Sequence, residues 1–122
     1  MKNFYIGEFK KDASDPIYKG WFVGEFMKDE PRKNNELEVK YWEFKKGKTT
    51  HPTKISETIE CTIVLEGSMK GEVGQVPITL SKGEYIVIHP GIENNITQEA
   101  LSDIKGFTIK APSIPNAKKI VG

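Results

Sequence analysis

The sequence is poor in the residues that build most catalytic centres. Its 122 residues include one cysteine, Cys61, and two histidines, His51 and His89. A single cysteine excludes an internal disulfide, and Cys61 lies in an apolar stretch where a free thiol packs as a small hydrophobe. Cys-x-x-Cys, Gly-x-Ser-x-Gly and a glycine-rich phosphate loop are also missing. Nucleophilic and nucleotide-dependent chemistry therefore have no support in the sequence.

The chain also lacks an excess of charge and a long apolar run. Eighteen Lys and Arg residues against 17 Asp and Glu residues leave a formal net charge of +1. This balance creates no field that would attract nucleic acid or an anionic membrane. No window approaches the roughly 18 apolar residues of a membrane span, and the N-terminus lacks the apolar core of a signal peptide. We expect one cytoplasmic domain with no nucleic-acid or membrane partner.

Hydrophobic residues recur with a period close to two along most of the chain. In segment 59–65, apolar residues alternate with Glu60, Thr62 and Val64, which should share one face of a strand. Turn-forming residues follow at short intervals: Gly47, Gly67, Gly74, Gly83, Pro90-Gly91 and Ser102-Asp103. The pattern predicts an all-β domain whose antiparallel strands form a sandwich or barrel, without a long helix.

The composition divides the chain into an N-terminal arm and loop (1–36), a barrel core (37–110) and a tail (111–122). The arm carries many large apolar side chains between Phe4 and Phe26. These must be covered by the barrel or by a second copy of the chain, and we expect a homodimer. The tail contains Pro112 and Pro115, so the last regular strand is predicted to end near Lys110.

Two stretches resemble the motifs of the cupin superfamily. Segment 60–67 has a glutamate and, at the end of the strand, Gly67, and it resembles the second half of the first cupin motif. Segment 83–94 resembles the second motif, in which a strand that opens with glycine ends in a Pro-Pro-Gly turn, and His89 takes the place of the first proline. The resemblance implies a cupin-type jelly-roll β-barrel, of the kind formed by small single-domain bacterial cupins.

Most cupin enzymes bind a divalent metal through three histidines and one glutamate. The resemblance carries these four positions onto Thr53, Ile55, Glu60 and Asn94. Only Glu60 is a usual ligand, so we predict that the chain has no standard metal site and no cofactor. A non-standard site formed by His51, His89 and either Glu57 or Glu60 remains an alternative.

We predict that a small polar molecule binds in the barrel mouth, where barrels commonly hold ligands. The candidate contacts are three polar residues of the two motifs, a histidine before the first motif and two aromatic residues: Glu60, His89, Asn94, His51, Tyr41 and Trp42. A carboxylate inside a barrel must be paired, hydrogen-bonded or protonated, so Glu60 could equally pair with a lysine. The aromatic residues, together with Trp21 and Phe44, either stack on a ligand or form core.

Two other functions stay open. The first is a metal-independent enzyme resembling the sugar-nucleotide epimerases and isomerases of this superfamily, with histidine as general base, although no local His-x-Asp pair supports it. The second is a structural or regulatory dimer whose barrel is filled by Thr53, Ile55, Thr62 and Val64. The fold does not decide among them, because one fold hosts many functions.

Overall fold

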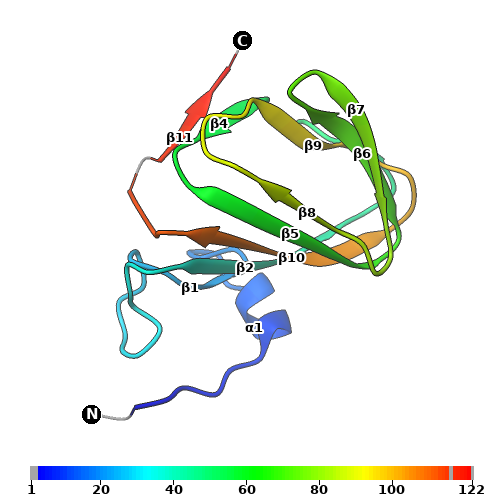
Figure 1. Ribbon diagram of the computed structural model, residues 1–122. Helices are drawn as coiled ribbons and strands as arrows, with labels where there is room; N and C mark the ends of the chain where they lie inside the picture. The colour runs from blue at the N-terminus through cyan, green and yellow to red at the C-terminus, as the bar shows by residue number, and fades with distance from the viewer. Residues whose placement is uncertain (1–2, 116, 122) are drawn as a thin grey trace.

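The structure is a computed structural model that describes residues 3–115 and 117–121. Two antiparallel sheets face each other and form a barrel (Figure 1). The first sheet has the order β1 (Trp21–Val23), β2 (Glu38–Phe44), β10 (Ile104–Ala111), β5 (Ile59–Glu66) and β8 (Tyr85–Ile88). The second has the order β11 (Lys118–Ile120), β4 (Lys54–Ser56), β9 (Asn94–Ala100), β6 (Ser68–Val73) and β7 (Val76–Ser81), with β3 (Gly47–Lys48) beside β9. The predicted all-β antiparallel barrel is confirmed.

Helical structure in the described residues is limited to α1 (Phe9–Ala13). Its five residues form little more than one turn, in agreement with the absence of any apolar period of 3.6. No helix of residues 3–115 and 117–121 is long and apolar enough to cross a membrane.

The alternation predicted for segment 59–65 is present in β5. Glu60, Thr62 and Val64 are buried on the face that lines the barrel, whereas Ile59 and Leu65 on the other face are exposed. Val64 belongs to the apolar core, which fills the closed part of the barrel between the two sheets. The other buried members of that core are Trp42, Met69, Leu80, Ile88, Ile96, Ala100 and Ile104. The polar residues of β5 therefore lie toward the other end of the barrel.

The predicted turn residues lie between consecutive strands, except Gly47, which begins β3. Gly67 separates β5 from β6 and has a φ of +82°, which glycine adopts without strain. A Cβ at this position would collide with the carbonyl oxygen of Asp103, so the turn also requires the absence of a side chain. Gly83 lies between β7 and β8 with a φ of +85°.

The N-terminal segment covers the outer face of the first sheet at β2 and β10. Figure 1 shows α1 outside the barrel, next to β2. The Phe9 ring lies 4.5 Å from the Tyr41 ring and 5.3 Å from the Phe107 ring. Tyr41 and Trp42, on opposite faces of β2, are therefore both buried, Tyr41 beneath the arm and Trp42 inside the barrel.

The prediction that the last regular strand ends near Lys110 is wrong. Strand β10 ends at Ala111, as the prolines require, but the chain then forms β11, which pairs with β4. Pro112 and Pro115 interrupt the backbone pairing only locally, so the tail resumes strand structure where β4 offers a free edge.

Candidate functional site

The barrel contains a cavity of about 190 Å³ at its polar end. Strands β2, β5 and β10 form one wall, and residues of β4, β9 and the segment before β4 form the opposite wall. The cavity is lined by four aromatic side chains, which are Trp21, Trp42, Phe44 and His51. It is also lined by four lysines, which are Lys40, Lys54, Lys110 and Lys118. Glu60 contributes a carboxylate to the lining of the cavity.

The register of the three central strands places these side chains beside one another. On β10, Lys110 lies opposite Glu60 of β5, and two residues earlier Thr108 lies opposite Thr62. On the other side of β10, Thr108 pairs with Lys40 of β2. Residues two positions apart share a face, so one face of the sheet carries these groups together.

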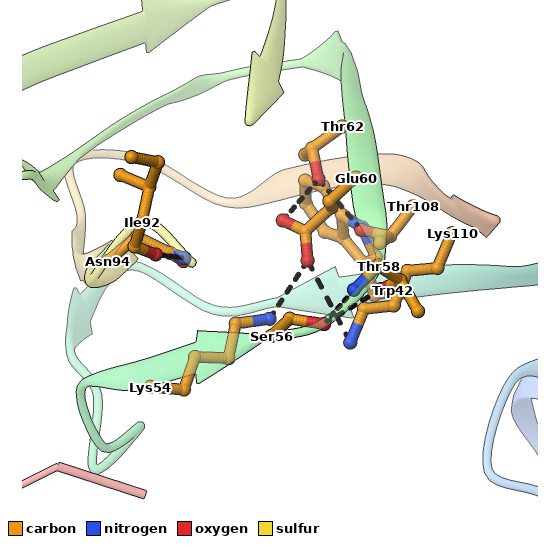
Figure 2. A network of polar contacts seen from close by, with 10 residues as sticks. All are labelled: Trp42, Lys54, Ser56, Thr58, Glu60, Thr62, Ile92, Asn94, Thr108 and Lys110. Carbon is orange, nitrogen blue, oxygen red and sulfur yellow. Dashed lines mark hydrogen bonds and ion pairs between the residues drawn. The ribbon is translucent and has the colours of Figure 1, made fainter. Parts of the chain in front are cut away.

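Glu60 is the centre of a polar network (Figure 2). Its side chain is buried, and its Oε1 lies 2.9 Å from Lys54 Nζ and 3.8 Å from Lys110 Nζ. Its Oε2 accepts a hydrogen bond of 3.3 Å from Thr62 Oγ1. The two ammonium groups supply the countercharge that a buried carboxylate needs. Glu60 thus faces the cavity and pairs with lysine as well.

Trp42 forms a fixed aromatic wall. Its indole nitrogen donates a hydrogen bond of 3.0 Å to Thr108 Oγ1, and Thr108 Oγ1 lies 3.0 Å from Thr62 Oγ1. The Trp42 ring also stacks on Phe44, with 5.5 Å between centroids. Trp42 lies opposite Gly106 of β10, where a Cβ would collide with the indole. Only glycine at this position lets the ring lie across the strand.

The lysines give the cavity an excess of positive charge. Burial lowers the pKa of Lys40, and Lys118 and Lys54 lower it further. Burial and the charge of Lys54 lower the pKa of Lys110 to about 8, although Glu60 acts in the opposite direction. Both shifts mean that the cavity accommodates its own positive charges poorly. A bound anion would relieve this repulsion.

His51 lies at the rim of the cavity. Its ring contacts Phe44, with 4.9 Å between centroids. Partial burial of the ring and the charges of Lys40 and Lys54 lower its pKa. The lowered pKa favours the neutral imidazole over a further positive charge.

The structure brings three of the six predicted ligand contacts to the cavity and separates the others from it. Glu60, Trp42 and His51 line the cavity. Tyr41 points to the opposite face of β2 from Trp42 and packs on Phe9, because successive side chains of a strand alternate.

His89 and Asn94 lie outside the lining of this cavity. His89 is exposed in the turn after β8. Asn94 is buried, and its Nδ2 donates a hydrogen bond of 3.0 Å to the carbonyl oxygen of Ile92, while its Oδ1 has no partner among the described residues. Figure 2 shows the pair Asn94 and Ile92 apart from the Glu60 network. The next residue, Asn95, lines the cavity instead.

The lysines are the site residues that sequence reasoning missed. Lys40 and Trp42 are two residues apart on β2, as are Thr108 and Lys110 on β10. The alternation of side chains along a strand therefore places the two members of each pair on one face. The pattern could not show which face of β2 lines the barrel, because Tyr41 and Trp42 are both large and both buried. Strand pairing decides this point.

The residues present do not fit the metal that the cupin resemblance implies. Glu60 is surrounded by the ammonium groups of Lys54 and Lys110, which oppose a dication. Thr53 and Ile55 offer no imidazole. Within residues 3–115 and 117–121, no three His, Cys, Asp or Glu side chains are grouped as a metal would require, so the alternative site with His51 and His89 is not formed either.

Comparison with known proteins finds similarity in structure but not in sequence. No family model matches the chain, and no curated protein matches it. A cupin family protein with a double-stranded β-helix fold from Methanocaldococcus jannaschii superposes with a TM-score of 0.66 at 18% identity, over 93% of this chain and 94% of that one. The chain has the cupin fold. At this identity the likeness concerns the fold alone.

Two further similar structures carry different descriptions, one of an uncharacterized protein and one of an enzyme. An uncharacterized conserved protein with a double-stranded β-helix domain from Klebsiella pneumoniae matches with a TM-score of 0.62 at 16% identity, over 73% of this chain and 77% of that one. The DMSP lyase DddQ from Ruegeria pomeroyi also matches with a TM-score of 0.62, at 13% identity over 73% of this chain. The match spans only 45% of the lyase. The function of this cupin fold must therefore be argued from its own cavity.

Proposed function

We propose that this cupin-fold protein binds a small organic anion in the mouth of its barrel, without a metal. The observation that carries the proposal is the charge of the cavity, in which four lysines face one carboxylate, Glu60. Ammonium groups form strong hydrogen bonds with carboxylates and phosphates. An anion would gain these bonds and also reduce the repulsion among the lysines.

The cavity limits the size and shape of the ligand. Its volume is about 190 Å³. A cavity of about 150 Å³ in another protein holds one benzene molecule, so a ligand here has the size of about one ring. Trp42 and Phe44 provide flat apolar walls. We therefore expect a planar or apolar body that carries one anionic group.

Lys40 is the cation best placed to bind the anion. Lys54 already has an ion pair with Glu60, whereas Lys40 has no ion pair with any described residue. Its Nζ lies 5.5 Å from the centroid of the Trp21 ring, on the lining of the cavity. The anionic group of the ligand would supply the partner that Lys40 lacks.

The intrinsic fluorescence of the protein tests the proposal directly. The chain has two tryptophans, and both Trp21 and Trp42 line the cavity. Benzoate serves as the anionic probe and benzamide as a neutral probe of the same shape. We expect a saturable fluorescence change with benzoate, and about tenfold weaker binding of benzamide, because a hydrogen bond to a charged group contributes about 1.5 kcal/mol or more.

A matched pair of lysine variants locates the binding site. Lys40→Met should weaken benzoate about tenfold or more, because it removes the unpaired cation. Lys82→Met, which changes an exposed lysine in the turn between β7 and β8, should leave the affinity unchanged. Equal affinity for benzoate and benzamide would contradict the proposal. No fluorescence change with either probe would favour the dimer without ligand.

A further inference from the structure

The amine of Lys110 has an unusual position in the cavity. Its side chain is 10% exposed, and it enters the cavity from β10, the central strand of the wall. No hydrogen bond to its Nζ exists within the part of the chain that the structure describes, and its nearest charged partner is Glu60 Oε1 at 3.8 Å. Lys54 is closer to the same oxygen, at 2.9 Å. Glu60 therefore binds Lys54 first and leaves the amine of Lys110 available.

The charges around Lys110 favour its neutral form. Lys54 of β4 and Lys118 of β11 face it from the second sheet, and both lower its pKa. Glu60 of β5 and Glu38 of β2 flank it on neighbouring strands and act in the opposite direction. Burial is the largest effect, and the balance lowers the pKa of Lys110 to about 8. A useful fraction of the amine is thus neutral near physiological pH, as a lysine nucleophile requires.

We propose that Lys110 is a nucleophile that forms an imine with the carbonyl group of a small oxo acid bound in this cavity. The inference rests on the proposed function, because the lysines that bind an anion would hold the carboxylate of the same molecule. Lys40 is placed to bind that carboxylate from β2, next to β10. The carbonyl carbon, one or two atoms away, would then meet the amine of Lys110.

Glu60 is placed to carry the protons of this reaction. The lone pair of the neutral Lys110 Nζ forms a bond to the carbonyl carbon, and the π electrons of the carbonyl move to its oxygen. The Glu60 carboxylate accepts a proton from the nitrogen and passes it to that oxygen, which gives a carbinolamine. The carbon–oxygen bond then breaks, and the second nitrogen proton leaves through Glu60 with the hydroxyl group as water. One amine and one carbonyl compound thus give one imine and one water, with no change of oxidation state.

Borohydride trapping tests the imine with two matched probes. Pyruvate carries the carbonyl group, and lactate has the same carbon skeleton and carboxylate but a hydroxyl group instead. After incubation with sodium borohydride, which reduces an imine to a stable secondary amine, peptide mapping by mass spectrometry identifies the modified residue. We expect a pyruvate adduct at Lys110 and none with lactate. The trapping rate should increase with pH through about 8, where Lys110 loses its proton.

Two variants separate the imine from simple binding. Lys110→Met removes the amine, and Lys110→Arg removes the nucleophile but keeps the charge if the methionine variant does not fold. Both should lose the adduct, whereas the unchanged protein should bind lactate in the fluorescence assay without forming one. Lys82→Met should trap pyruvate as the unchanged protein does.

The possible failures are distinguishable. Pyruvate that is bound by fluorescence but leaves no adduct at Lys110 would overturn the imine and leave the anion site standing. Adducts spread equally over exposed lysines such as Lys82 would overturn it as well. Benzoate binding without pyruvate binding would overturn the oxo acid as the ligand class. Failure of every anion to bind would overturn the proposed function itself.

Discussion

Lys54 Nζ lies 2.9 Å from Glu60 Oε1, inside the barrel mouth. In the cupin resemblance, Glu60 occupies the position of the metal-binding glutamate. Here the charge next to this carboxylate belongs to the protein, because Lys54 and Lys110 both contact it. Two positive charges beside this carboxylate oppose the binding of a dication, and they are the basis of the anion site proposed above.

Substitution of Glu60 should destabilise the fold. Glu60→Gln leaves Lys54 and Lys110 without their countercharge in a site where Glu60 is only 3% exposed. Breaking a buried ion pair costs about 3 kcal/mol or more, and we expect a loss of this size in the free energy of unfolding measured in urea.

The surface ion pair between Lys70 and Glu99 provides the control for that measurement. Its atoms are 3.4 Å apart, but the lysine side chain is 55% exposed. Glu99→Gln should therefore cost less than about 1 kcal/mol. Equal losses for the two variants would mean that the Glu60 network does not contribute as a buried pair.

Stability should depend on pH through Lys110. The pKa of Lys110 is about 8 in the folded protein and returns to its ordinary value of 10.5 on unfolding. Between these values the unfolded chain binds more protons, so the free energy of unfolding should rise with pH, by roughly 3 kcal/mol from this one group. Urea unfolding between pH 8 and pH 10 measures the rise.

Lys110→Met isolates this contribution, because the variant keeps every other titrating group. The rise between pH 8 and pH 10 should be much smaller in the variant. Above pH 10 both proteins should lose stability, since burial raises the pKa of Tyr41 from 10.0 to about 12 and the unfolded chain then ionises first. An identical pH profile for the two proteins would show that Lys110 is fully protonated in the fold.

The metal content of the purified protein should be low. A single carboxylate beside two ammonium groups cannot hold a transition metal against water, so we expect less than roughly a tenth of an equivalent of Fe, Mn, Ni, Cu or Zn per chain. A chelator should not lower the melting temperature, because only a ligand of the native state would have raised it. Elemental analysis of untagged protein provides the measurement. Stoichiometric metal that disappears in both His51→Ala and His89→Ala would contradict this prediction.

A homodimer remains the expected oligomeric state. The N-terminal segment covers the first sheet with Phe9 but leaves Phe4 63% and Ile6 85% exposed. Apolar side chains in such numbers usually meet a partner, and two-fold dimers are the commonest oligomers. Light scattering at micromolar concentration should give about twice the chain mass of 13.8 kDa. Ile6→Glu should shift the mass toward the monomer, and a monomer in the unchanged protein would rule the dimer out.

The sequence alone determined the class of the fold and the inward face of β5. The alternation around Glu60 and Thr62 follows from the geometry of any extended strand, so it is visible without knowledge of the strand's neighbours. Turns such as the one at Gly67 are equally local, since a positive φ restricts the residue itself. For the same reason Glu60 could be predicted as a buried carboxylate that needs a partner.

Only the tertiary structure decided which residues share the cavity. Lys110 and Glu60 are 50 positions apart in the chain and meet because β10 pairs with β5 in one particular register. On β2, the N-terminal arm covers Tyr41 and the barrel covers Trp42, so both side chains are buried. The hydrophobicity of the two residues therefore does not show which of them lines the cavity. The charge of the cavity therefore depends on pairings between distant strands that local residue preferences do not encode.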